Sequence, residues 1–200
     1  MLRLFQLRGF AAFISMVFLN AFVDLGHKIV IQNTVFRVFD GSTQVTLTAI
    51  LNGLILLPFV FLFTGSGYLS DRYAKPRVMK LAAAAAVVLT ALITVCYARG
   101  WFWPAFGMTL LLGVQAAVYS PAKLGYIKEL VGITRLTSAN GLVQAVSTIA
   151  ILAGIFIFSI FFERHLAGVV ATTSGEVLTH LTPLGYALVA CSLVEFALAF

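Results

Sequence analysis

The sequence has few charged residues and few cysteines, and both shortages narrow the class of protein. Only 10% of its 200 residues are Asp, Glu, Lys or Arg, whereas 61% are hydrophobic. Soluble domains carry about 25% charged residues, so this composition indicates a membrane protein. The two cysteines, Cys96 and Cys191, lie in apolar runs, where we expect small buried side chains. Disulfide frameworks and metal-ligand spacings are also missing from the sequence, so we expect neither a metal nor a cofactor.

Long uncharged runs separate the few charges that are present. Residues 41–70 and 81–98 contain no Asp, Glu, Lys or Arg, and a helix needs about 20 apolar residues to cross the hydrocarbon core. The basic residues lie in short loops and form no stripe mixed with aromatics, so we expect no nucleic-acid partner. The pattern predicts an all-α integral membrane protein with six transmembrane helices, at about 9–38, 45–68, 78–98, 102–121, 137–162 and 182–200.

The loop charges predict the orientation of these helices. If the N-terminus is cytoplasmic, the inner loops carry nine basic residues and the outer loops three. The inner set is Arg3, Arg8, Arg72, Lys75, Arg77, Lys80, Lys123, Lys128 and Arg135, and the outer set is Arg37, Arg99 and Arg164. This asymmetry satisfies the positive-inside rule. Trp101 and Trp103 then lie near the outer surface, where indole rings commonly anchor in the headgroup zone.

The first predicted helix has the richest set of polar residues. Its residues Asn20, Asp24, His27 and Lys28 are spaced i, i+4, i+7 and i+8, which places them on one face of a helix. Charges inside a membrane are costly and therefore mark candidate functional sites. Asp24 and Lys28 either form a structural ion pair or bind the opposite charges of a zwitterionic substrate. His27 either titrates and couples transport to protons or is simply hydrogen-bonded.

Further polar residues lie in later helices. Gln115 and Tyr119 share a face of the fourth helix, which we expect to break at Pro121. The fifth helix repeats the i, i+4, i+7, i+8 spacing, and Asn52 stands alone on the second. We expect Asn52, Gln115 and Tyr119 to belong to the translocation path. For Gly141 and Gly154 we expect close helix packing. The fifth-helix set is Asn140, Gln144, Ser147 and Thr148. We expect Ser147 and Thr148 to form hydrogen bonds between helices. We expect Asn140 and Gln144 to belong to the translocation path, because their amides need several partners each.

The charged stretch GYLSDRYAKPR, residues 67–77, separates two uncharged runs. It resembles the G-x-L-x-D-R-x-G-R-K loop between helices 2 and 3 of the major facilitator superfamily, with Ala74 in place of a glycine. In that superfamily the loop braces the cytoplasmic side of two six-helix halves. The resemblance implies a cytoplasmic gating loop made of Gly67, Asp71, Arg72, Lys75 and Arg77, in the N-terminal half of a longer protein whose C-terminal half is not in this chain.

Two further strings narrow the resemblance. AVYSPAKLGYIKEL followed by LTSANGLVQ, together with FVDLGHK, is similar to the bacterial lysophospholipid transporter family. This implies import or flipping of lysophospholipids such as lysophosphatidylethanolamine across the bacterial inner membrane for reacylation, by alternating access. The family's acidic position in helix 1 falls on Asp24. DLGHK and QNTVF look more like members fused to an acyltransferase and an acyl-carrier-protein synthetase.

The chain itself lacks the marks of two other functions. Drug antiporters of the superfamily usually carry an Arg in helix 4, where this chain has Gln115, and a G-P-x-x-G-G element in helix 5. An acyltransferase motif would place Asp five residues after a His, but His27, His165 and His180 are followed there by other residues. We therefore expect a transporter segment and no enzyme within these residues. The alternatives are a transporter of another amphiphile or drug, or a membrane anchor for a fused phospholipid acyltransferase.

Overall fold

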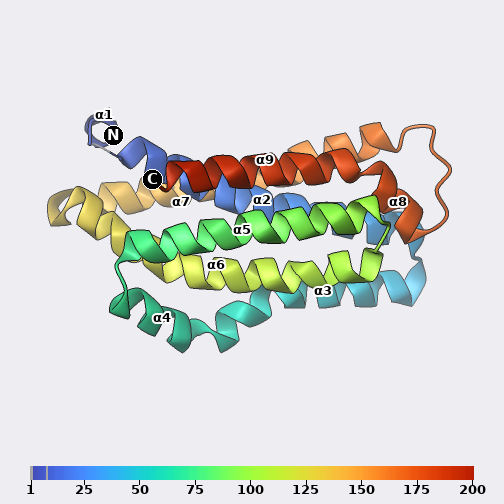
Figure 1. The fold of residues 1–200 in the computed structure, drawn as a ribbon, viewed down its shortest axis with the longest axis horizontal. Coiled ribbons are helices and arrows are strands. Elements are labelled where there is room, and N and C mark those ends of the chain that lie inside the picture. Colours follow the sequence, from blue (N-terminus) through green and yellow to red (C-terminus); the bar gives the residue numbers. More distant parts are fainter. Residues whose placement is uncertain (1, 8) are drawn as a thin grey trace.

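Long helices that run side by side make up most of the chain, which is known from a computed structural model describing residues 2–7 and 9–200 (Figure 1). Arg8 of the predicted inner cations therefore lies outside the described residues. The described part contains no strand. The helices are α1 Leu2–Phe5, α2 Phe10–Val38, α3 Gly41–Phe61, α4 Phe63–Arg72, α5 Lys75–Ala98, α6 Phe102–Val131, the 3₁₀ turn η1 Ile133–Arg135, α7 Leu136–His165, α8 Ser174–His180 and α9 Thr182–Leu198.

Five of these segments are long and apolar enough to cross a membrane: α2, α3, α5, α6 and α7 together with η1. The pair α8 and α9, bent by 58° at their junction, adds a sixth if the two count as one span. Helices suit a bilayer because they satisfy every backbone hydrogen bond within the segment. The prediction of an all-α, multi-pass membrane protein is therefore confirmed.

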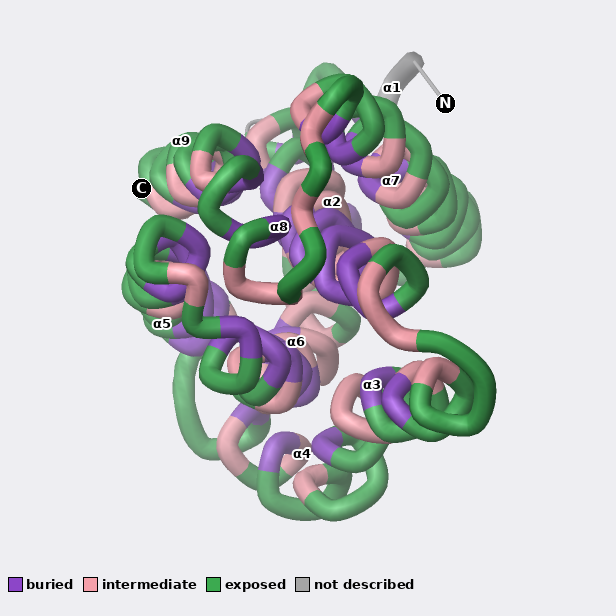
Figure 2. Tube along the Cα trace, turned by 90° about the vertical axis from the view of Figure 1, so that its right-hand side faces the viewer, coloured by how far each residue is buried: buried purple, intermediate pink, exposed green. Residues whose placement is uncertain are grey.

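Helix α2 lies inside the bundle, with α7, α9 and α6 around it (Figure 2). Helix α5 packs between α6 and α9, and α3 and α4 cover α6 on the side away from α9. The first and last helices, α1 and α9, place both chain ends at one end of the bundle, and α8 lies at the opposite end (Figure 1).

Small residues allow α2 and α7 to approach closely. A Cβ atom at Gly154 would lie 2.9 Å from the backbone oxygen of Phe22, and one at Gly26 would lie 2.6 Å from the Phe158 ring. Such contacts are how membrane helices gain packing energy. The packing prediction for Gly154 is confirmed, but that for Gly141 is wrong, because a Cβ atom there would meet no described atom within 4 Å.

Two helix boundaries differ from the sequence-based expectation. Helix α6 continues through Pro121 to Val131, so the predicted break at Pro121 is wrong. The turns after Pro121 bury Ala122, Ile127 and Val131, and this packing outweighs the one backbone hydrogen bond that a proline removes. Conversely, the segment expected as one helix at 45–68 is divided at Leu62 into α3 and α4, four residues after Pro58.

The apolar interior forms two separate clusters, one toward each end of the bundle. On α2 the first ends at Val17 and the second begins at Val23. On α6 the two are separated by the interval from Leu112 to Tyr119. Between the clusters the buried positions include polar side chains, and this interval holds the candidate site.

Candidate functional site

A polar layer lies between the two apolar clusters. We define it as Asn20 on α2, Gln115 on α6, and Ser192 and Glu195 on α9, all of which are buried. The Asn20 amide nitrogen lies 3.5 Å from the Gln115 Oε1 atom, and the Gln115 amide donates to the Ala82 carbonyl at 3.2 Å. These contacts connect α2, α6 and α5, and the structure thus brings together two of the residues predicted from separate helices.

His27 forms a second connection between helices, seven residues after Asn20. Its ring is fully buried. Its Nε2 lies 3.1 Å from the Ala105 carbonyl, which can only accept, so Nε2 carries the hydrogen. The neutral ring then accepts at Nδ1 from the Tyr97 hydroxyl, 2.9 Å away, and Thr109 Oγ1 lies 3.3 Å from Nε2. His27 therefore joins α2 to α5 and α6, in agreement with the hydrogen-bonded alternative for this residue.

Asp24 and Lys28 do not form the ion pair that their spacing allows. The Lys28 ammonium instead donates to the Gln32 side chain one turn further along α2. The single ion pair among the described residues joins Lys75 to Glu129, elsewhere in the bundle. Asp24, Lys28 and Gln32 are each half-buried, so this stripe lies at the edge of the packed interior. Lys123 on α6 is the cation whose charge attracts Asp24.

Three predicted residues lie away from the polar layer. Asn52, Asn140 and Gln144 are exposed in the described part of the chain, and Asn52 donates only to the Thr48 carbonyl of its own helix. Gly154 of α7 packs against α2 near Asp24. Gln144 lies ten residues before Gly154 on α7, which places it about 15 Å from the level of Asp24 along the helix axis. The structure therefore separates Asn140 and Gln144 on α7 from the stripe on α2, whereas Ser159 further along α7 accepts a hydrogen bond from Asn33 of α2 at 3.2 Å.

Tyr119 and Glu195 complete the centre of the bundle. The Tyr119 hydroxyl is buried without a partner among the described residues, and so are the Ser192 hydroxyl and both carboxylate oxygens of Glu195. Sequence reasoning missed Glu195. The signal was present, because Glu195 is the only charged residue between 182 and 200, and an acid in an apolar run marks a candidate site.

The loop predicted to act as a gate is mostly helical. Gly67, Asp71 and Arg72 belong to α4, where Arg72 donates to the Tyr68 hydroxyl at 2.7 Å. The turn itself is Tyr73–Ala74. Ala74 has φ −57°, so the alanine that replaces the family's glycine causes no backbone strain.

Lys75 connects this turn to the end of α6. Its ammonium lies 3.0 Å from the Glu129 carboxylate. A Cβ atom at Gly125, one turn before Glu129, would lie 2.7 Å from the Lys75 stem, so the glycine provides the space that the lysine occupies. Lys75 of the motif at 67–77 therefore packs directly against the segment KLGYIKEL of α6.

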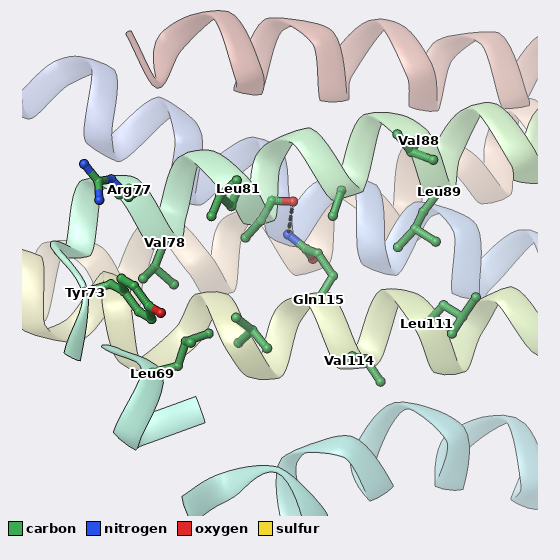
Figure 3. Close-up of a pocket in the computed structure, with 13 residues that line it drawn as sticks. Leu69, Tyr73, Arg77, Val78, Leu81, Val88, Leu89, Leu111, Val114 and Gln115 are labelled. Atoms are coloured by element: carbon green, nitrogen blue, oxygen red, sulfur yellow. Dashed lines mark hydrogen bonds between the residues drawn. The ribbon is translucent and has the colours of Figure 1, made fainter. Parts of the chain in front are cut away.

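An apolar groove of about 820 Å³ lies between α4, α5 and α6. Figure 3 shows Tyr73 and Arg77 at one end and Leu89 and Leu111 at the other, with Gln115 between them. A groove of this size with one or two polar groups suits an elongated apolar ligand. The lining includes Leu69, Val78, Leu81, Val88, Val114 and Val118.

Comparison with known proteins identifies relatives of this chain. It is 34% identical to the lysophospholipid transporter LplT of Photorhabdus laumondii over 163 residues, which is 80% of the chain. The corresponding protein of Escherichia coli strain SE11 is 34% identical over 164 residues. Over four fifths of its length the chain is similar to bacterial lysophospholipid transporters. A further relative, LplT of Serratia proteamaculans, is 37% identical over 118 residues, or 59% of the chain.

The similarity covers part of each relative. The chain spans 38% of the length of the Photorhabdus and Escherichia transporters and 27% of the Serratia transporter. No protein-family model matches the sequence, and no solved structure does. All three relatives are named as transporters, in agreement with the expectation of a transporter segment rather than an enzyme.

Proposed function

We propose that this chain is the N-terminal six-helix half of a transporter that flips lysophospholipids across the bacterial inner membrane for reacylation. The observation that carries the proposal is the similarity to lysophospholipid transporters over 80% of the chain. Alternating access would move the two halves around a midplane site. The polar layer, which lies between the two apolar clusters, is positioned for such a site.

The half-buried stripe Asp24, Lys28 and Gln32 is the proposed headgroup contact. A zwitterionic lysophosphatidylethanolamine carries a phosphate and an ammonium, which match a lysine and an aspartate. Because Lys28 bonds to neutral Gln32, its charge is available to the phosphate of a ligand. Asp24 forms no ion pair among the described residues, with Lys28 or with Lys123, so it remains available to the ammonium. This arrangement favours the substrate-binding alternative over the structural ion pair.

The apolar groove is the proposed path for the single acyl chain. It runs beside α5 for the distance from Arg77 to Val88, eleven residues or about 16 Å. Arg77 lies at one end of the groove, where its guanidinium can reach the headgroup region of the membrane surface. Apolar side chains line most of the remaining groove wall. An acyl chain held against these apolar side chains stays out of water, and the hydrophobic effect favours this position.

The proposed orientation places the N-terminus and the gating loop in the cytoplasm. It rests on the excess of basic residues counted above. Lys123 leaves that count because it lies on α6, where it acts on Asp24, but eight inner basic residues still oppose three outer ones. Trp101 and Trp103 are exposed at the opposite end of the bundle, as anchors in the outer headgroup zone would be. In this arrangement Asn52, Asn140 and Gln144 are exposed toward a C-terminal half outside this chain.

Uptake of labelled lysophosphatidylethanolamine by bacterial spheroplasts tests the proposal. The full-length parent is compared with Asp24→Asn and Lys28→Met at matched expression, and Asp40→Asn and Lys128→Met remove the same charges at exposed positions as controls. We expect uptake by the parent and both controls, and its loss in the two stripe variants. Normal uptake in the stripe variants would return Asp24 and Lys28 to a structural role. An inactive parent would instead favour another amphiphile or an acyltransferase anchor.

A further inference from the structure

The buried oxygen atoms without a hydrogen-bond partner gather in one place. Among the described residues they are the Tyr119 hydroxyl, the Ser192 hydroxyl and both carboxylate oxygens of Glu195. Ser192 and Glu195 are one turn apart on the same face of α9. Both are fully buried, and the Glu195 charge acts on Tyr119 across the bundle. Buried polar groups are nearly always paired, so four unpaired atoms together call for a ligand.

The helices around Glu195 supply few charges. Helix α2 presents Asp24, whose charge repels that of Glu195, and Asn20, whose amide lies near the Glu195 carboxylate without forming a hydrogen bond to it. Helix α6 presents Tyr119 and Lys123. On α9 itself the nearest titratable group is Cys191, one turn earlier. Helix α5 contributes none at this level, since its Lys80 lies with its ammonium 2.9 Å from the centroid of the Phe200 ring. Helix α7 has no titratable residue from 136 to 162, and α8 lies at the far end of α9.

A charge count across this centre leaves one negative charge uncompensated. Neither Asp24 nor Glu195 forms an ion pair among the described residues; Lys123 is the cation whose charge acts on Asp24, and no described cation acts on Glu195. An ionised carboxylate in an apolar interior without a partner is far more costly than a neutral carboxyl group. One added proton makes the set Asp24, Lys123 and Glu195 neutral overall and turns an acceptor-only group into a donor.

We propose that Glu195 is a proton-binding site, occupied in the state seen here, and that its proton leaves when the polar layer opens to water during transport. In that step the carboxyl O–H bond breaks, water accepts the proton, and the carboxylate remains hydrated. Binding of the proton restores the closed, dry layer. The site itself follows from the packing of α9, whereas its coupling to lipid movement rests on the proposed transport function.

The site and its coupling are tested separately with the purified full-length parent. Infrared difference spectroscopy across a pH titration detects the carbonyl band of a protonated carboxyl group. We expect this band in the parent and in the matched control Glu163→Gln, an exposed acid at the end of α7, and its loss in Glu195→Gln. A band that persists in Glu195→Gln, or its absence from the parent, would overturn the proton site.

Lysophosphatidylethanolamine uptake into proteoliposomes tests the coupling. We expect parent uptake to fall by up to about tenfold per pH unit on its alkaline limb, as for one titrating group, and Glu195→Gln uptake to lose this dependence. An unchanged pH profile of uptake in Glu195→Gln would refute the coupling. If uptake by the parent requires sodium and uptake by Glu195→Gln does not, the ion bound at this site is Na⁺ and the proton proposal is overturned. A parent that moves no lysolipid at any pH would refute the transport function and the coupling, while the infrared result still decides the site.

Discussion

Replacing His27 with Phe isolates the hydrogen bonds that join α2 to α5 and α6. Phe keeps a ring of similar size but can neither donate nor accept. The Tyr97 hydroxyl, now 2.9 Å from Nδ1, would remain buried without a partner, and the bond to the Ala105 carbonyl would be lost. The Ala105 carbonyl would still accept a backbone hydrogen bond within α6. The unpaired Tyr97 hydroxyl therefore accounts for most of the expected loss of stability.

The magnitude follows from that unpaired group. A buried polar group without a partner costs about 1–3 kcal/mol, and single hydrogen bonds in a membrane bundle average about 0.6 kcal/mol. We therefore expect His27→Phe to lower the free energy of unfolding by about 2 kcal/mol. Tyr97→Phe, which leaves Nδ1 unpaired, should cost about 1 kcal/mol. The double variant should be less destabilised than the sum by about 1 kcal/mol, because neither partner is then left unpaired.

The assay is equilibrium unfolding of the purified full-length parent in detergent micelles, followed by circular dichroism as denaturant is added. The four proteins of the double-mutant cycle are compared under one condition. Additivity within about 0.5 kcal/mol would show that His27 and Tyr97 do not interact, and would refute the hydrogen-bonded role. Lysolipid uptake by His27→Phe with an altered pH profile would instead support the proton-coupling alternative for this histidine.

Three further changes test the packing and the groove. Gly154→Ala should lower the free energy of unfolding by about 1–3 kcal/mol, because the new methyl group would lie 2.9 Å from the Phe22 carbonyl oxygen. Glu129→Gln should cost less than about 1 kcal/mol in the same unfolding assay, because its bond to Lys75 is partly solvated. Ala85→Trp should leave the free energy of unfolding unchanged but lower lysolipid uptake several-fold, because the indole would fill the groove.

Each of these expectations has its own control. Gly141→Ala adds the same methyl group to α7 in open space and should be tolerated; equal effects at the two glycines would contradict the close packing of α2 and α7. A cost above about 3 kcal/mol for Glu129→Gln would show a buried rather than a surface pair. Leu152→Trp introduces the same indole on an exposed face of α7, and matched loss of uptake there would exclude a specific role for the groove.

The helix positions could be predicted because they depend on local composition. Uncharged runs predict membrane helices, and the basic residues of GYLSDRYAKPR mark where one ends and the next begins. Pro121 shows the limit of local rules: a proline predicts a break, but α6 continues through it because the turns that follow bury Ala122, Ile127 and Val131 in the bundle.

The site could be predicted only in part because its contacts join distant positions. The stripe on α2 followed from helical periodicity, yet nothing local shows that His27 meets Tyr97, 70 residues away, or that Asn20 meets Gln115, 95 residues away. The spacing of Asp24 and Lys28 allowed a pair that the structure replaces with Gln32. Glu195 was overlooked although its charge in an apolar run was visible in the sequence.

Reconstitution of the full-length parent tests the transport account most directly. Proteoliposomes carrying the parent, and liposomes without it, are given labelled lysophosphatidylethanolamine and, separately, a single-chain amphiphile without a charged headgroup. We predict protein-dependent movement of the lysolipid that Asp24→Asn reduces, and none of the uncharged amphiphile. Equal movement of both compounds, or none of the lysolipid above the protein-free level, would contradict lysophospholipid transport by this protein.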